Sequence, residues 1–536
     1  MADGSRKQRH AHSLSYDTRA DSPGARLRVN RICSQCFGHG LWHNGRVFSA
    51  AGIGGEELSH QSTPTLPTRL GRWSWLVAVG PLLPVMLLGF FNDDYAILDY
   101  VESAPGSQLL GYIHKAGFEF FRPAAILLFR AEYLLFGVRA QLFHAVNLGL
   151  LLVAAILAAK LLSRLAGRST YAWAAAASLL YPARFEALAW VAALPDLLAL
   201  VLLSSALLVL LETREVPSAS RLVALGVLGF LTPLAKESGF ALPLVALAWE
   251  FLGLLPPIPV RARVLRCGAV VSGSLAAAVL RTCVLGGMGG YRDTSIQAAL
   301  HSLRGLVGML VRVILVPVNP TFGLLSRAIA GACLVSALFL LVAAARSRCW
   351  RVLAGALSVV LGGLLPPIAY LHRTELAWSH NRLVTITGLG VVLLLLSGLE
   401  EASRWRRLAA STLLVAWTAA SLINLTAWLQ ADARRQLIVQ TVERVTRAAG
   451  RHKVWIAGRI DDYYRGTRLA GHLPEAVRRA MPGRDVVVDS EHLQRYQGRP
   501  LVPPCSESGV QVHLFRFDPL TPELSPVTPQ ESSTCQ

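Results

Sequence analysis

Phe90-Phe91-Asn92-Asp93-Asp94-Tyr95 lies where the first long apolar run of the chain ends. That run, Trp73 to Phe91, is apolar except for Ser74 and is long enough to cross the hydrocarbon core of a bilayer. Acidic groups at a membrane boundary are costly unless water, a metal, a basic partner or a substrate compensates them. Because Asp93 and Asp94 are neighbours, their side chains point in different directions. We interpret one as a reactive carboxylate and the other as its support; the alternative is that both are solvated charges at a helix end.

The composition indicates a polytopic membrane protein. Of the 536 residues, 53% are hydrophobic and only 16% are charged, whereas ordinary soluble domains carry about a quarter charged residues. The net charge of +19 lies largely in the N-terminal tail and in short loops between apolar runs, where Lys and Arg mark the cytoplasmic side. The chain carries no motif of nucleic-acid recognition, so we expect no nucleic-acid partner.

About eleven apolar runs are predicted to span the membrane. They are 73–91, 141–162, 170–190, 195–211, 222–234, 240–255, 264–284, 329–345, 352–370, 383–399 and 408–428. Arginines cluster in the loops that this count places inside, for example Arg404, Arg406 and Arg407. The pattern predicts a multi-pass protein of a bacterial inner membrane, with a cytoplasmic N-terminus and an extracytoplasmic C-terminus.

The predicted fold class is an all-α polytopic membrane protein with a small C-terminal α/β domain. Two outside loops each contain an apolar stretch interrupted by arginines, at 118–136 and 303–316, which suits a helix lying at the membrane interface. Strands are predicted at 453–457, 485–489 and 510–517, with a helix near 474–479. The predicted divisions are a disordered basic tail (1–72), the transmembrane domain (73–428), the α/β domain (429–518) and a disordered tail (519–536).

Unusual polar groups recur at the predicted outer ends of several spans. Glu186 is the clearest case, because a carboxylate inside an apolar run costs several kcal/mol if it is unpaired. It is a candidate catalytic group, and the alternative is an ion pair with Arg184 or Lys236 that only holds helices together. The Gly286–Gly290 run is at least a turn and opens no predicted helix, so by itself it is weak evidence for phosphate binding.

The order of these motifs resembles the GT-C glycosyltransferases, and within them the bacterial relatives of protein O-mannosyltransferases and of the transmembrane mannosyltransferases that carry TPR repeats. The resemblance covers about residues 73–428. The matching residues are 92–94, 121–123, 142–148, 181–182, 186–187, 190, 196–198, 235–239, 281 and 286–291. Two departures matter: Tyr181 replaces a usual histidine, and the C-terminal TPR array is absent.

The resemblance implies transfer of a sugar, hexosyl or mannosyl in type, from a polyprenyl-phosphate donor to a protein, lipid or glycan acceptor on the outer face. It implies an aspartate of the first outside loop, Asp93 or Asp94, as the base, since an acceptor hydroxyl needs one within hydrogen-bond reach. Fixed positive charge favours departure of the lipid phosphate. The predicted substrate-binding residues are Arg122, Lys236, Glu237, Tyr291, Arg292 and Arg382.

Two further points stay open at the level of sequence. No metal is required for a phosphate leaving group, although the Asp93-Asp94 pair leaves room for a divalent ion. The alternative function is a membrane transporter or a lipid or glycolipid flippase, which would also line a polar cavity with charges. A transporter should show paired halves or helices broken near mid-membrane, whereas the predicted polar groups here gather at one face.

Overall fold

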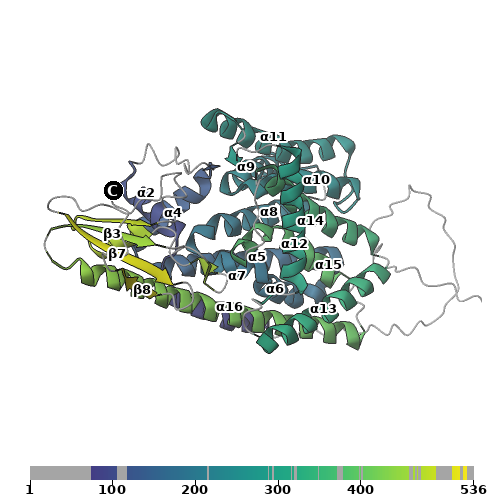
Figure 1. The fold of residues 1–536 in the computed structure, drawn as a ribbon. Helices are drawn as coiled ribbons and strands as arrows, with labels where there is room; N and C mark the ends of the chain where they lie inside the picture. Colours follow the sequence, from purple (N-terminus) through teal and green to yellow (C-terminus); the bar gives the residue numbers. More distant parts are fainter. Residues whose placement is uncertain are drawn as a thin grey trace, which may run out of the picture. The chain divides into compact units, whose positions relative to one another are not determined.

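A computed structural model gives the structure of the chain (Figure 1). It describes residues 74–105, 118–213, 216–287, 289–291, 295–315, 317–318, 323–347, 349–370, 378–397, 399, 403–448, 450–457, 463–464, 467–468, 473–490, 510–518 and 523–527. The predicted N-terminal tail and Arg292 lie outside these residues.

Helices make up nearly all of the described chain up to Val445. The 3₁₀ helices are η2 (Ser74–Leu87), η3 (Arg168–Thr170), η4 (Val191–Ala193), η5 (Glu237–Phe240) and η7 (Trp378–Val384). The α-helices are α2 (Asp93–Ser103), α4 (Pro123–Phe136), α5 (Ala140–Ala166), α6 (Tyr171–Leu180), α7 (Pro182–Ala189), α8 (Leu194–Glu212), α9 (Ala219–Ala235), α10 (Ala241–Phe251), α11 (Val260–Leu285), α12 (Ile296–Leu315), α13 (Gly323–Arg346), α14 (Trp350–Tyr370), α15 (Thr387–Leu396) and α16 (Arg404–Val445).

Among the described residues, five segments are long and apolar enough to cross a membrane: Ala140–Ala166, Val191–Glu212, Val260–Leu285, Gly323–Arg346 and Arg404–Val445. Further apolar helices are shorter, among them Trp75–Leu87 and Ala219–Ala235. Every run predicted to span the membrane is largely helical. The prediction of an all-α polytopic membrane protein with a small C-terminal α/β domain is confirmed.

One predicted span is broken. The run 170–190 forms two helices, α6 and α7, that meet at Tyr181-Pro182. Tyr181 leaves the helical conformation (ψ 117°) and Pro182 opens α7 at its first position. Proline has no N–H for the bond that a continuous helix would need, and it restricts the residue before it to extended backbone. The break places Glu186 on a short, fully buried helix instead of a long span.

Helices α9 and α11 pack closely through glycines. A Cβ added at Gly273 would lie against the carbonyl oxygen of Gly226 and 2.9 Å from the backbone nitrogen of Phe230. Both neighbours are backbone atoms, so the helices themselves would have to move apart. Gly268 lies on the same helix, and a Cβ there meets nothing within 4 Å.

We therefore expect opposite effects from two matched substitutions on α11. Gly273→Ala should destabilise the protein by about 1–3 kcal/mol, as overpacking of a close contact does. Gly268→Ala should be neutral or stabilising by up to about 1 kcal/mol, because alanine restricts the unfolded chain more than glycine. Thermal unfolding in detergent compares the two variants. Equal midpoints would contradict this close packing of α9 and α11.

The described residues of the C-terminal domain include a four-stranded sheet in the order β6-β3-β7-β8, made from β3 (Arg451–Ala457), β6 (Val486–Ser490), β7 (Val510–Asp518) and β8 (Glu523–Pro526). Strand β3 pairs in parallel with β6 and β7, and β7 pairs antiparallel with β8. Helix α17 (Leu473–Ala480) packs against both β6 and α16. Two short strands, β4 (Tyr463–Tyr464) and β5 (Thr467–Arg468), pair antiparallel with each other.

Two features of this region differ from the expectations. Helix α16 runs unbroken from Arg404 to Val445, so the boundary predicted at residue 429 falls inside one helix. Strand β8 lies in the segment after Asp518 that was predicted to be loose. Pairing of β8 covers the outer edge of β7, which would otherwise present unpaired backbone groups.

Two histidines stack between neighbouring strands of the sheet. Nδ1 of His452 lies 3.1 Å from Nε2 of His513, and the rings are nearly parallel with centroids 5.3 Å apart. Nε2 of His452 lies 2.9 Å from the carbonyl oxygen of Ala448. With His452 donating to that carbonyl, its Nδ1 accepts from His513. Burial, and secondarily the neighbouring His452, lower the pKa of His513.

The histidine pair predicts that the C-terminal domain loses stability in acid. Because the folded-state pKa of His513 is lowered, the unfolded chain binds more protons near pH 6, and stability falls as the pH drops through 6.5. Hydrogen exchange of β7, measured at pH 7.5 and pH 5 for the wild type and His513→Gln, checks this. The variant should show the smaller change with pH. Equal changes in both proteins would contradict the assignment.

Candidate active site

The turn that carries the acidic pair is held from two sides. Asn92 adopts a positive φ of 42°, unusual for a residue other than glycine, and ends the extended segment just before α2. The N–H of Gly89 donates to Asp432 Oδ2 of α16 (3.3 Å). The carbonyl oxygen of Gly89 lies 3.4 Å from Nε2 of His144 on α5. Phe91 packs edge-on against Trp428 of α16. The geometry at the start of α2 is therefore set by distant helices.

Asp94 is a buried support. Its Oδ2 accepts the N–H of Phe91 (2.7 Å) and its Oδ1 accepts the N–H of Ala192 in η4 (2.6 Å). Only 1% of the residue is exposed. Burial raises the pKa of the Asp94 carboxyl to about 8, against the opposing effect of the two backbone N–H groups. Both oxygens are thus occupied: Oδ2 holds the turn before α2, and Oδ1 ties α2 to η4.

Asp93 occupies a different position. It is half-buried and lines a small cavity of about 70 Å³, which we call the Asp93 cavity. Arg122 lines the same cavity, and apolar groups that include Phe120 and Pro195 form much of the remaining wall. Of the two neighbouring carboxylates, Asp93 is therefore the one that a small molecule can reach.

Glu237 holds two arginines beside this cavity. Arg122 approaches its carboxylate through Nη2 (2.8 Å) and Nε (3.0 Å) to Oε2. Nη1 of Arg281 on α11 donates to Glu237 Oε1 (3.0 Å) and to the carbonyl oxygen of Phe121 (3.3 Å). The Glu237 side chain is 3% exposed, whereas Arg122 keeps 24% of its side chain exposed above the ring of Phe120. The carboxylate is engaged in positioning these arginines.

A second group of ion pairs joins the first through adjacent residues. Lys236 Nζ lies 2.8 Å from Asp196 Oδ2 in α8. Arg382 Nη1 donates to Glu186 Oε1 (2.7 Å), its backbone N–H donates to Oε2 (3.2 Å), and its Nε lies 4.0 Å from Asp196. The Arg382 guanidinium also lies 4.0 Å above the ring of Trp190. Since Lys236 and Glu237 are consecutive, the ion pairs form one cluster.

The structure thus brings together most of the residues singled out in the sequence: Asp93, Asp94, Arg122, Glu186, Lys236, Glu237 and Arg382. Glu186 is paired, but with Arg382 and not with Arg184 or Lys236. Tyr291 lies in β2 (Gly290–Tyr291), whose backbone pairs with β1 (Phe118–Glu119) just before Arg122. The glycine-rich run therefore reaches the first loop, while Arg292 is outside the described residues.

Other participants were missed by sequence reasoning. Asp432 and Arg435 of α16 pair with each other, and Arg435 also donates to the hydroxyl of Tyr95. Arg312 of α12 donates to the side-chain oxygen of Asn381 (2.9 Å), next to Arg382. The sequence signal for Asp432 and Arg435 is their Asp-x-x-Arg spacing in a helix just beyond an apolar run. This spacing is common on exposed helices, so it does not by itself indicate a buried ion pair. Within the described residues, no cluster of three or more His, Cys, Asp or Glu is arranged to hold a metal.

Comparison with known proteins gives two structural likenesses. No family model matches the chain, and no curated protein matches it. A crystal structure of ArnT from Cupriavidus metallidurans bound to undecaprenyl phosphate is 14% identical, with a TM-score of 0.42, over 84% of this chain and 94% of that chain. The apo structure of the same protein is 15% identical, with a TM-score of 0.32, over 77% and 88%.

At such TM-scores these likenesses say nothing of individual residues. We therefore base the functional proposal on the site itself.

Proposed function

We propose that this chain is a membrane glycosyltransferase that moves a sugar, hexosyl or mannosyl in type, from a polyprenyl-phosphate-linked donor to an acceptor hydroxyl. The observation that supports it best is the Asp93 cavity, where an accessible carboxylate and a partly exposed arginine share one space. A hydroxyl nucleophile needs a base, and a phosphate leaving group needs fixed positive charge.

The step that this layout supports is a single displacement at the anomeric carbon. Asp93 takes the proton of the acceptor hydroxyl as the bond from that oxygen to the sugar carbon forms. The bond from the sugar carbon to the phosphate oxygen breaks, and polyprenyl phosphate leaves with the electron pair. Arg122 and Arg382 are our candidates for the phosphate contacts, because a guanidinium presents forked donors to phosphate oxygens.

The buried carboxylates support these arginines in our proposal. Glu237 behind Arg122 and Glu186 behind Arg382 fix each guanidinium while leaving 24% and 17% of the two side chains exposed. Such preorganised charge stabilises a leaving group without reorganising during the reaction. We assign Glu186 to this role and not to direct proton transfer, because both of its oxygens already accept from Arg382.

We also propose the orientation and the location of the site. The distribution of Lys and Arg supports a cytoplasmic N-terminus and an extracytoplasmic C-terminal domain in a bacterial inner membrane, which puts the Asp93 cavity on the outer side. The acceptor would then be a protein, lipid or glycan of the cell envelope. A reporter fused after Trp428 should be external, and a cytoplasmic location would overturn this orientation.

The experiment that tests the function supplies a radiolabelled extract of polyprenyl-phosphate-linked sugars to the purified protein in lipid nanodiscs, with a cell-envelope extract as acceptor. We expect labelled sugar to pass to the acceptor, with polyprenyl phosphate released in equal amount. A transporter or flippase would instead move labelled lipid between the leaflets of proteoliposomes and form no glycosylated product. That result would overturn the proposal.

A further inference from the structure

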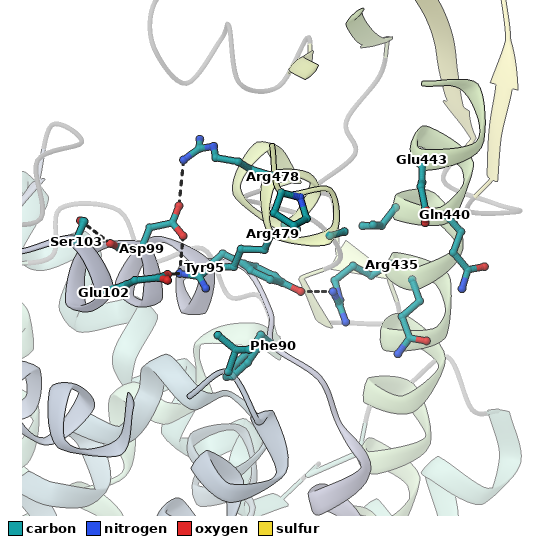
Figure 2. Close-up of a pocket in the computed structure, with 16 residues that line it drawn as sticks. Phe90, Tyr95, Asp99, Glu102, Ser103, Arg435, Gln440, Glu443, Arg478 and Arg479 are labelled. Atoms are coloured by element: carbon teal, nitrogen blue, oxygen red, sulfur yellow. Dashed lines mark hydrogen bonds and ion pairs between the residues drawn. The ribbon is translucent and has the colours of Figure 1, made fainter. Parts of the chain in front are cut away.

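A second and larger cavity lies on the other side of helix α2. Its volume is about 890 Å³, within the range of roughly 300–1,000 Å³ that is usual for ligand sites. Residues of α2, of the end of α16 and of α17 line it (Figure 2), and we call it the α2–α16–α17 cavity. The transmembrane and C-terminal parts of the chain both contribute to it, and the function proposed above does not use it.

Helix α2 separates the two cavities. Asp93, Ala96 and Ile97 line the Asp93 cavity, whereas Tyr95, Asp99 and Glu102 line the α2–α16–α17 cavity. Residues spaced by three and four share one face of a helix, so these sets lie on opposite faces of α2. The larger cavity is thus a separate site that shares a wall with the first.

The charges of the lining are balanced. Its described residues include three arginines (Arg435, Arg478 and Arg479) and three carboxylates (Asp99, Glu102 and Glu443). Figure 2 shows how the arginines of α17 reach α2: Arg478 lies 3.2 Å from Asp99, and Arg479 lies 2.7 Å from both Asp99 and Glu102. Arg435 is paired with Asp432. A lining with no net charge favours neither a phosphate nor a polycation.

One amide and one carboxylate remain available for hydrogen bonds on the α16 side. The Gln440 and Glu443 side chains extend from α16 at the cavity (Figure 2), and no described residue is their hydrogen-bond or ion-pair partner. Apolar groups, among them Phe90, Val439 and Pro482, alternate with these polar ones. Amide and carboxylate groups suit ligand hydroxyls, and the apolar patches suit the C–H faces of a sugar ring. An acyl chain would leave the polar lining unsatisfied.

We propose that the α2–α16–α17 cavity binds a neutral carbohydrate. Gln440 and Glu443 bond its hydroxyl groups, while the ion-paired arginines of α17 close the cavity from the C-terminal domain. Under the proposed function, on which this last step rests, the carbohydrate is a part of the acceptor glycan away from the reacting hydroxyl, because that hydroxyl and the donor meet at Asp93. Binding itself does not depend on catalysis, so it can be measured even if no sugar is transferred.

The test measures binding of tetrasaccharides to the full-length protein in nanodiscs by saturation-transfer NMR. The probes are neutral tetramers of mannose, glucose and N-acetylglucosamine, with tetragalacturonate as the anionic comparison. We expect at least one neutral tetramer to bind, and at least tenfold weaker binding in Gln440→Leu and in Arg478→Met. Gln430→Leu, the same change on α16 outside the cavity lining, and Asp93→Asn should bind as the wild type does.

Three results would overturn the proposal: no neutral tetramer binds, tetragalacturonate binds more tightly than the neutral tetramers, or Gln440→Leu and Gln430→Leu weaken binding equally. The failure of the proposed function looks different. In that case, neutral tetramers bind with the expected variant pattern but no sugar transfer is detected in the donor assay.

Discussion

Replacing Asp93 with asparagine should lower the rate of sugar transfer by roughly 10²–10⁴-fold, the usual loss when a general base is removed. Asparagine keeps the size of the side chain and most of its hydrogen-bonding ability but cannot take a proton. Donor binding should survive, because the phosphate contacts come from the arginines. The measurement is initial rate of transfer together with binding of polyprenyl phosphate, for the wild type and Asp93→Asn.

Asp94→Asn is the matched control, since the same change is made one residue away. The two oxygens of Asp94 accept the N–H groups of Phe91 and Ala192. An amide nitrogen cannot accept, so one of these donors loses its partner, at a cost of about 1–3 kcal/mol. We expect a lower melting temperature and a smaller rate loss per folded molecule than in Asp93→Asn. The reverse ranking, with a stable and inactive Asp94→Asn, would make Asp94 the base.

Replacing Glu237 with glutamine should have the largest effect on stability. The carboxylate compensates Arg122 and Arg281, and its side chain is 3% exposed. Removal of one partner from a buried ion pair leaves uncompensated charge and typically costs about 3–5 kcal/mol. Thermal unfolding in detergent should therefore show a large loss. Donor binding should also weaken, because Arg122 is no longer held at the Asp93 cavity.

Glu212→Gln is the control for this change. Glu212 pairs with Arg164 at 3.3 Å, but both side chains are 52% exposed, so the pair should contribute no more than about 1 kcal/mol. The double variant Glu237→Gln with Arg281→Met also removes one of the two arginine charges that lose their partner. It should therefore recover part of the lost stability. If Glu237→Gln and Glu212→Gln have equal melting temperatures, the buried cluster does not have the role that we assign to it.

The positions of the helices were largely predictable from the sequence, because an apolar run of the required length can cross a bilayer only as a helix or as part of a closed barrel. Prolines cause the local irregularities: Pro182 divides the run 170–190, and Pro81 and Pro84 lie within the 3₁₀ helix η2. The strands β3, β6 and β7 were predicted from the sequence, whereas β8 is recognisable only by its pairing with β7.

The identity of the site partners was not predictable in the same way. Arg122 and Glu237 are 115 residues apart, and Glu186 and Arg382 are 196 apart. Nothing in a single sequence fixes which buried cation meets which carboxylate. The difference between Asp93 and Asp94 likewise arises from η4, whose Ala192 N–H occupies one of them. The α2–α16–α17 cavity was missed because its lining residues read as ordinary surface positions.

The most direct test of the central claim is an electron cryomicroscopy structure of Asp93→Asn with a polyprenyl-phosphate-linked sugar, since this variant should bind the donor without consuming it. We predict density for the phosphate in contact with the Arg122 guanidinium, with the anomeric carbon of the sugar facing residue 93. A donor phosphate bound elsewhere on the protein, with the Asp93 cavity empty, would contradict the account.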